Sequence, residues 1–147
     1  MIDLQLRLAI AQDFPLLAIM NRQLIEDERS ENTMSLEQLE HRLRGFVDKG
    51  WKIVLAESEA IPVGYTTFFE GQDELKSYRS RIHIGHYFIR RERRKLGLGT
   101  EFLRKLEQEW FPAGAKIVLD VLIANSSAQA FYRSLGFLPY SMLMEKG

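Results

Sequence analysis

The 147-residue sequence contains no cysteine, which excludes disulfide bonds, thiolate metal sites and a cysteine acyl-enzyme intermediate. It has no excess of charge, because 20 basic residues balance 20 acidic ones. A neutral chain argues against general binding to nucleic acid or to a membrane surface. No apolar run nears the length that spans a bilayer, and the first residues, MIDLQLRLAI, lack the cationic segment of a signal peptide. We therefore expect a cytoplasmic protein with a single domain over residues 1–147.

The spacing of the apolar residues predicts an alternation of strands and helices. Strands are expected where these residues alternate or run together, at 4–10, 51–57, 63–69, 82–89, 116–123 and 137–145. Helices are expected where they recur every three or four residues, at 13–25, 35–50, 97–110 and 125–135, with polar loops at 26–33 and 70–80. Ser35 and Gln38 have the spacing of a capping box at the start of the second helix. The resulting order, β-α-α-β-β-β-α-β-α-β, predicts an α/β domain in which one mixed sheet has helices on both faces.

The stretch from Ile82 to Trp110 combines a strand, a basic turn and an amphipathic helix. The turn, 90–95, holds five basic residues, and Gly97-Leu98-Gly99-Thr100 opens the helix. Free N–H groups at a helix N-terminus and the helix dipole attract anions, and glycines let a phosphate come close to the backbone. The sequence therefore predicts a phosphate cradle in this turn.

The two best-known phosphate-binding motifs are absent from this stretch. There is no Walker A loop, since no lysine follows Gly99, and no Rossmann fingerprint, since Phe102 stands where its third glycine would be. The segment 94–99, Arg-Lys-Leu-Gly-Leu-Gly, matches R/Q-x-x-G-x-G/A, and Asn125 to Phe137 matches N-x-x-A-x-x-[FL]-Y-x-x-x-G-F. On these residues the sequence resembles the GNAT (Gcn5-related N-acetyltransferase) family over nearly its whole length. The fold implied is a mixed, mostly antiparallel sheet flanked by helices, in the order predicted above.

This resemblance implies that the protein binds acetyl-CoA as a cosubstrate and moves its acetyl group to a primary amine. Without a cysteine to carry the acetyl group, transfer is expected to be direct, in a ternary complex. The loop amides would hold the CoA pyrophosphate, with Arg94 and possibly Lys95 in contact with CoA phosphates. The backbone near Phe88 or Ile89 would stabilise the oxyanion. The implied CoA-binding residues are Phe88, Ile89, Arg94, Lys95, Leu96, Gly97, Leu98, Gly99, Thr100, Asn125, Ala128 and Tyr132. No metal is expected.

The resemblance also implies catalytic roles for individual side chains. Tyr132 would protonate the departing CoA thiolate, since its hydroxyl is a proton donor with a pKa of about 10; a packed core tyrosine is the alternative. A base must deprotonate the amine, and His83 is the first candidate, with Glu70 also within expected reach. Strand alternation should place His86 on the face opposite His83, and His41 should be solvated. A mechanism without a single base stays open.

The acceptor is the least defined part of the prediction. The two polar loops, which in the GNAT family border the acceptor pocket, are acidic and favour a cationic acceptor such as a polyamine, an aminoglycoside or a protein lysine. Their acidic residues are Glu26, Asp27, Glu28, Glu31, Glu70, Asp73 and Glu74. The alternatives are an acyltransferase with another acyl-CoA or acceptor, and a non-catalytic CoA-binding sensor. Asn125 could also act only as a helix cap. Pro139 interrupts the last predicted strand, so a second subunit could complete the sheet edge, which would make a homodimer.

Overall fold

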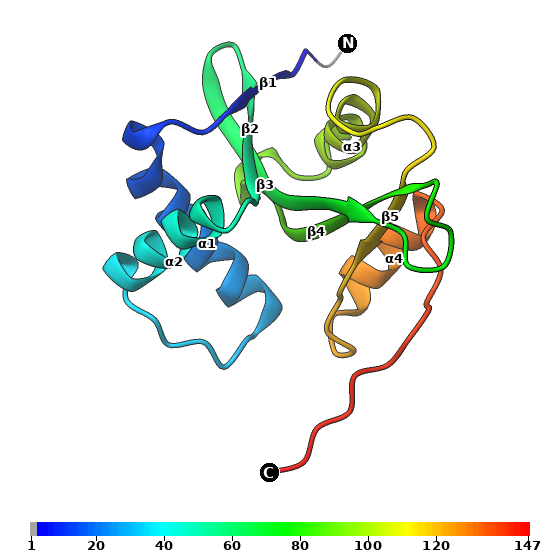
Figure 1. The fold of residues 1–147 in the computed structure, drawn as a ribbon. Coiled ribbons are helices and arrows are strands. Elements are labelled where there is room, and N and C mark those ends of the chain that lie inside the picture. The colour runs from blue at the N-terminus through cyan, green and yellow to red at the C-terminus, as the bar shows by residue number, and fades with distance from the viewer. Residues whose placement is uncertain (1–2) are drawn as a thin grey trace.

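The computed structural model describes residues 3–147, which form one five-stranded sheet in the order β1-β2-β3-β4-β5 with helices on both faces (Figure 1). The strands are β1 (Gln5–Leu8), β2 (Lys52–Ser58), β3 (Ile61–Gln72), β4 (Ser80–Ile89) and β5 (Lys116–Leu119). The α-helices within this range are α1 (Phe14–Glu28), α2 (Leu36–Asp48), α3 (Leu98–Glu109) and α4 (Ser126–Ser134). Short 3-10 turns lie at Ala11–Asp13 and Arg91–Arg93. The predicted α/β fold and the predicted order of elements up to α4 are confirmed. None of the helices described is both long and apolar enough to cross a bilayer.

The sheet separates two apolar layers, as the strand alternation predicts. On one face α1 and α2 pack on the sheet, where Leu17 and Leu43 meet the buried ring of Phe88. On the other face Phe102 of α3 packs in a second cluster with Phe68. The layers fix the two sides of β4, because alternate residues of that strand belong to different layers.

The strands β4 and β5 stay together over only part of their length. β1 to β4 pair antiparallel, whereas β5 pairs parallel with β4 from Arg81–Lys116 to Ile84–Leu119. After Leu119 the chain leaves the sheet, so the rest of β4, from Gly85 to Ile89, has no strand on that side among the described residues. This split leaves backbone groups of β4 open in the middle of the molecule.

A β-bulge in β4 corrects the expected placement of its histidines. The β3–β4 register shifts between Thr67 and Phe68, opposite Gly85, and the backbone N–H of His86 donates to Thr67 Oγ1 at 2.9 Å. A Cβ at Gly85 would lie 2.8 Å from that same Oγ1, which explains the glycine. Because a bulge inserts one extra residue into the strand, two residues three apart across it have their side chains on the same face of the sheet. The prediction of opposite faces is therefore wrong, because the rings of His83 and His86 both lie on the α1–α2 face, against Trp51 and Phe46 respectively.

The start of α2 confirms the predicted capping box and gives a stability prediction. The Gln38 backbone N–H donates to Ser35 Oγ at 3.2 Å, and the Ser35 backbone N–H donates to Gln38 Oε1 at 2.8 Å. We expect Ser35→Ala to lower the free energy of unfolding by about 1 kcal/mol, because one helix N–H loses its acceptor. Urea denaturation measures this effect. Ser77→Ala, at an exposed loop serine, is the control, and an equal loss in the two variants would contradict the cap.

Other boundaries differ from the predictions for identifiable reasons. α1 continues into the predicted loop 26–33 as far as Glu28, and its C-cap, Arg29, takes the left-handed conformation with φ of 54°. β3 continues to Gln72, so the loop 70–80 shrinks to seven residues, 73–79. β5 ends at Leu119 instead of residue 123, and its residues are only half-buried because it is the edge strand.

The last predicted strand, 137–145, is wrong. This segment has no regular secondary structure and leaves the sheet as an extended tail (Figure 1). Pro139 removes a backbone donor, and no neighbouring strand pairs with the segment. Phe137 still packs on the core, but the apolar side chains after it are exposed, including Leu138, Tyr140 and Leu143. The homodimer that would cover this edge stays a prediction.

Candidate functional site

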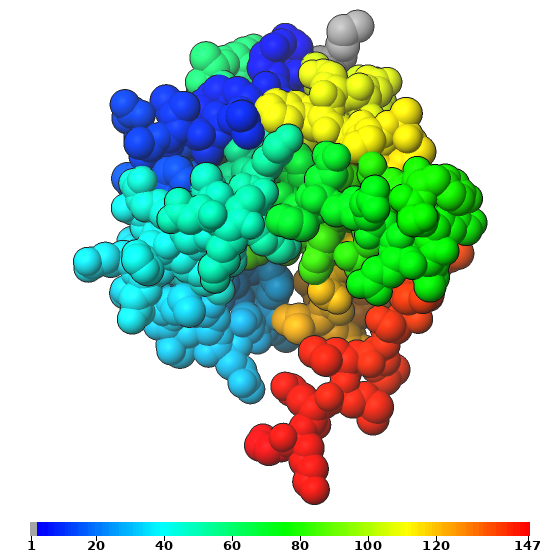
Figure 2. Space-filling view, viewed as in Figure 1, coloured from blue at the N-terminus to red at the C-terminus, as the bar shows by residue number. Residues whose placement is uncertain are grey.

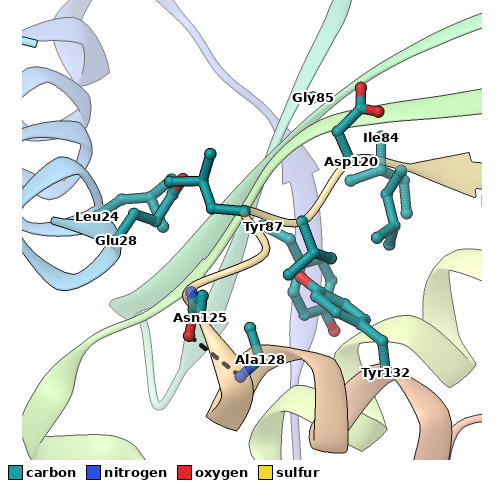
Figure 3. A pocket seen from close by; sticks show the side chains of 12 residues that line it. Leu24, Glu28, Ile84, Gly85, Tyr87, Asp120, Asn125, Ala128 and Tyr132 are labelled. Carbon is teal, nitrogen blue, oxygen red and sulfur yellow. Dashed lines mark hydrogen bonds between the residues drawn. The ribbon is translucent and has the colours of Figure 1, made fainter. Parts of the chain in front are cut away.

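A small cavity of about 100 Å³ lies where β4 and β5 part. It is lined from β4 by Ile84, Gly85 and Tyr87, from α1 by Leu24 and Glu28, from 119–122 after the split, and from α4 by Asn125, Ala128 and Tyr132 (Figure 3). The space-filling view shows the molecule hollowed between the helical half formed by α1 and α2 and the half that carries α4 (Figure 2). The site therefore joins segments from both ends of the chain, and it combines open β4 backbone with two polar α4 side chains.

The predicted phosphate cradle has the backbone geometry that an anion needs. Gly97 is the N-cap of α3 with φ of 80°, and Lys95 is also left-handed with φ of 65°. The first intrahelical bond runs from Glu101 N to Gly97 O at 3.1 Å, and no amide of residues 95–100 donates to a protein acceptor in the described chain. Six successive free N–H groups at the positive end of a helix form an anion site. The residues present thus fit a phosphate group.

Two arginines of the basic turn point away from the free amides, toward the end of α1. Arg94 Nε donates to the Ile89 carbonyl at 2.8 Å, and its Nη2 lies 2.5 Å from Asp27 Oδ2. Arg91 bonds Asp27 at 2.9 Å and Glu26 at 3.1 Å. These contacts tie the cradle to α1, so the predicted contact of Arg94 with CoA phosphates stays a prediction, while a positioning role for Arg94 is visible in its bonds.

The second motif brings Asn125 and Tyr132 to one cavity, as the spacing of seven residues predicts. Asn125 is the N-cap of α4, where its Oδ1 accepts from Ala128 N at 3.2 Å. The same side chain also lines the cavity, so capping leaves its amide nitrogen available for a ligand. Ala128 lines the cavity with a single methyl group, which leaves room beside the helix.

The hydroxyl of Tyr132 is held protonated at the cavity wall. Burial and the nearby Glu28 carboxylate raise the pKa of Tyr132 well above its usual value. Its ring packs at 5.2 Å from Phe131 and 6.3 Å from Tyr87, which orients it, and it makes no hydrogen bond to the cavity residues drawn in Figure 3. A protonated, unengaged hydroxyl is a group that can donate a proton.

Tyr87 joins the strand to the cradle. Its hydroxyl donates to the Gly99 carbonyl in the first turn of α3, and burial raises its pKa well above the usual value. Its ring stacks on Phe102 at 5.2 Å. The distance between cavity and cradle is therefore fixed by a side chain of β4.

The structure places the predicted base candidates at different depths. His83 is partly exposed, and its Nε2 lies 3.5 Å from Asp120 Oδ2; Asp120 lines the cavity, whereas His83 does not. His86 is half-buried and does not line the cavity, and Tyr65 Oη lies 3.1 Å from its Nδ1. Burial lowers the pKa of His86 to about 4, with help from the charge of Arg42, so this ring is neutral at neutral pH.

The other predicted residues are distributed over the sheet and the loops. Glu70 is exposed within β3 and does not line the cavity. His41 is exposed on α2 as predicted. Leu96 and Thr100 are exposed in the cradle, and Leu98 is buried beneath it. Of the base candidates, only His83 approaches the cavity, through Asp120.

The backbone of β4 faces the split with alternate residues. The N–H of Arg90 donates to Val63 O on β3, and His86 bonds to β3 through both of its backbone groups. In an antiparallel pair alternate residues turn their backbone groups to the same neighbour, so Ile89 faces the open side and Phe88 faces β3. The donation from Arg94 to Ile89 O agrees with this direction. The predicted oxyanion donor is therefore better placed at Ile89 than at Phe88.

Sequence reasoning gave no site role to Tyr87 or Asp120, and it expected Glu28 at the acceptor pocket on a loop, not on a helix. Glu28 was assigned to a loop, although Leu24 and Glu28 have the i, i+4 spacing of one helix face. Tyr87 was read only as part of the strand. Asp120 is the one charged residue within the apolar run 117–123, a signal that could have been read as the end of the strand.

Solved structures of acetyltransferases share this fold over almost the whole chain. A possible acetyltransferase from Clostridium difficile 630 has 15% identity and a TM-score of 0.78, with 98% of this chain and 96% of that chain covered. A predicted acetyltransferase from Clostridium acetobutylicum, solved with acetyl-CoA, has 17% identity and a TM-score of 0.74, with 99% and 96% covered. A GNAT family acetyltransferase from Staphylococcus aureus has 19% identity and a TM-score of 0.71, with 100% and 99% covered. At these identities the likeness establishes the class of fold.

The sequence itself establishes the family. The sequence model of the Acetyltransferase (GNAT) family matches residues 17–137, which include both motifs, most of α1 and every element from α2 to α4. The chain therefore belongs to the GNAT acetyltransferase family. No curated protein matches the sequence.

Proposed function

We propose that this protein is an acetyl-CoA-dependent N-acetyltransferase that moves the acetyl group directly to a primary amine. The observation that carries the proposal is that the Tyr87–Gly99 bond joins the six free amides at the α3 N-terminus to a cavity that has open β4 backbone and the protonated Tyr132 hydroxyl in its wall. A CoA ester has a pyrophosphate for the amides, a polar pantetheine arm for a strand edge, and a leaving thiolate for an acid.

The side chains divide the work of such a transfer. The amides of residues 95–100 bind phosphate, the open edge of β4 and the Asn125 side chain orient the arm, and the Ile89 N–H stabilises charge on the acyl oxygen. Tyr132 gives its proton to the departing thiolate and is reprotonated by the proton that the amine nitrogen loses.

Calorimetric titration with acetyl-CoA, with ATP and NAD as controls, tests the proposal. We expect micromolar binding of acetyl-CoA alone, and release of CoA thiol when amines are added. Binding without thiol release for any amine would favour the CoA-binding sensor. Absence of acetyl-CoA binding by folded protein would overturn the cofactor assignment altogether.

The bonds of Arg94 give a sharper prediction for the same titration. We expect Arg94→Glu to weaken acetyl-CoA binding by about 10-fold or more, because it breaks the bonds to Asp27 and Ile89 O and places a negative charge beside the phosphate site. Arg93→Glu is the matched control, since it makes the same charge change at a neighbour that has no ion pair among the described residues. Equal losses of acetyl-CoA affinity in the two variants would mean that Arg94 affects binding only through the net charge of the turn, and not through its bonds to Asp27 and Ile89 O.

A further inference from the structure

We propose that Glu28 at the end of α1 is the counterion for the acceptor's ammonium group and takes the first proton from it. This inference rests on the proposed acetyl transfer and names the group that selects its acceptor. It places the acceptor amine between α1 and the β4–β5 split, on the side of the cavity opposite α4. Figure 3 shows Glu28 with Leu24 on this side, across the cavity from Asn125, Ala128 and Tyr132.

The three successive acids of α1 have different partners. Glu26 and Asp27 are ion-paired with the arginines of the basic turn, at 3.1 Å and 2.5 Å for their shortest contacts. Glu28, one residue on, lies about a quarter-turn further round the helix, shares a helix face with Leu24, and lines the cavity with it. The two acids before it hold the cradle, and Glu28 alone of the three faces the reaction site.

Glu28 has no partner of its own in the cavity. It makes no hydrogen bond to any of the cavity residues drawn in Figure 3. The charge of Arg42 acts on it from α2, but Arg42 makes its hydrogen bond to Asn21 Oδ1 at 3.0 Å. A half-buried carboxylate that accepts no hydrogen bond is poorly solvated. A bound ammonium group, which has three N–H donors, would supply the missing hydrogen bonds.

The charge of the cavity lining fits a cation. Its ionisable lining residues are two carboxylates, Glu28 and Asp120, and the phenols of Tyr87 and Tyr132; no lysine, arginine or histidine is among them. Burial and the neighbouring Asp27 raise the pKa of Glu28 above its usual value, although Arg42 opposes the shift. A carboxylate with a raised pKa is a better proton acceptor. The cavity thus favours a protonated amine and offers it a base.

The proton balance is simple. The ammonium gives one proton to the Glu28 carboxylate, and the neutral nitrogen attacks the thioester carbonyl. The new C–N bond forms, the C–S bond breaks, and the thiolate takes the Tyr132 proton. The nitrogen loses its second proton, which restores Tyr132, and Glu28 returns its proton to solvent. The sum converts an ammonium and a thioester into an amide, a thiol and one free proton.

The test compares Glu28→Gln with the wild-type protein and uses benzylamine and benzyl alcohol as probes. The two probes have nearly the same shape, but the amine is charged at neutral pH and the alcohol is not. We expect Glu28→Gln to lower kcat/KM for benzylamine by about 10- to 100-fold, because the ammonium loses both its counterion and the base that deprotonates it. The inhibition constant of benzyl alcohol and the Kd of acetyl-CoA should stay within about 2-fold, because neither depends on the charge.

Glu107→Gln is the matched control. It removes the same charge from an exposed glutamate of α3, outside the cavity, and should leave all three constants unchanged. Equal kcat/KM for benzylamine in the two variants would overturn the role of Glu28 and leave acetyl transfer intact. Equal weakening of both probes in Glu28→Gln would also overturn it, because the loss would then reflect shape. Absence of thiol release from the wild-type protein with every amine would instead refute the proposed function.

Discussion

Replacing Tyr132 with phenylalanine should lower kcat by about 100-fold and leave the Kd of acetyl-CoA nearly unchanged. The substitution removes one oxygen from the cavity wall and retains the ring that packs between Phe131, Tyr87 and Phe137. Without the hydroxyl the thiolate must leave unprotonated or take its proton from water, and general acid catalysis is lost. The ring contacts that shape the cavity remain, so binding should not suffer. Thiol release under saturating amine measures kcat, and calorimetry measures Kd.

The control for this variant is Tyr140→Phe, which deletes the same hydroxyl from an exposed residue of the tail. It should match the wild-type protein in both measurements. A loss of acetyl-CoA affinity in Tyr132→Phe with unchanged kcat would identify the hydroxyl as a binding group. An unchanged kcat and Kd would leave Tyr132 with a packing role only, the alternative that its sequence pattern also allowed.

The parts of the site that the sequence predicted are those set by local chemistry. The cradle depends on Gly97, on the free amides after it, and on a helix that follows a strand, all within one short stretch. The Ser35 capping box and the Asn125 cap are likewise decided by residues three apart. Such patterns can be predicted from sequence because both partners of each hydrogen bond lie within a few residues of each other, whatever the tertiary structure.

The parts that the sequence did not predict depend on distant partners. The bulge at Gly85 arises because Thr67 on the next strand bonds the backbone of His86, and this contact reverses the side that alternation assigns. Glu28 was placed in a loop because the polar run after Ile25 hides a helix end that tertiary contacts prolong, among them the Arg91 and Arg94 pairs with Asp27. The last strand was predicted from its apolar content, but pairing needs a neighbour, and β5 ends too early to provide one. In each case a contact across the fold outweighed local propensity.

The stability of the protein should fall by about 3 kcal/mol as the pH falls from above 6.5 to about 4, as a result of His86 alone. In the folded protein burial and Arg42 lower the pKa of His86 from 6.5 to about 4, while the unfolded chain keeps the ordinary value. Below pH 6.5 His86 therefore binds a proton in the unfolded chain but not in the folded chain, so lowering the pH favours unfolding. The contribution is fully present above pH 6.5 and is lost at about pH 4, where both states are protonated.

Comparison of two histidine variants isolates this effect from the carboxylates. His86→Gln keeps an acceptor for Tyr65 Oη and removes the titration, so its unfolding free energy should depend less on pH between 6.5 and about 4. His41→Gln, at an exposed histidine of α2, should keep the wild-type dependence. Glu28 acts in the opposite sense, because a carboxyl whose pKa is raised in the folded state adds stability as the pH falls. The wild type and both histidine variants retain Glu28, so its contribution is the same in all three. Urea denaturation across this range measures the slopes, and parallel curves for the wild type and His86→Gln would show that His86 is not held neutral by the fold. A divergence of the size expected would confirm that the fold holds the His86 ring neutral, at a site that does not line the cavity.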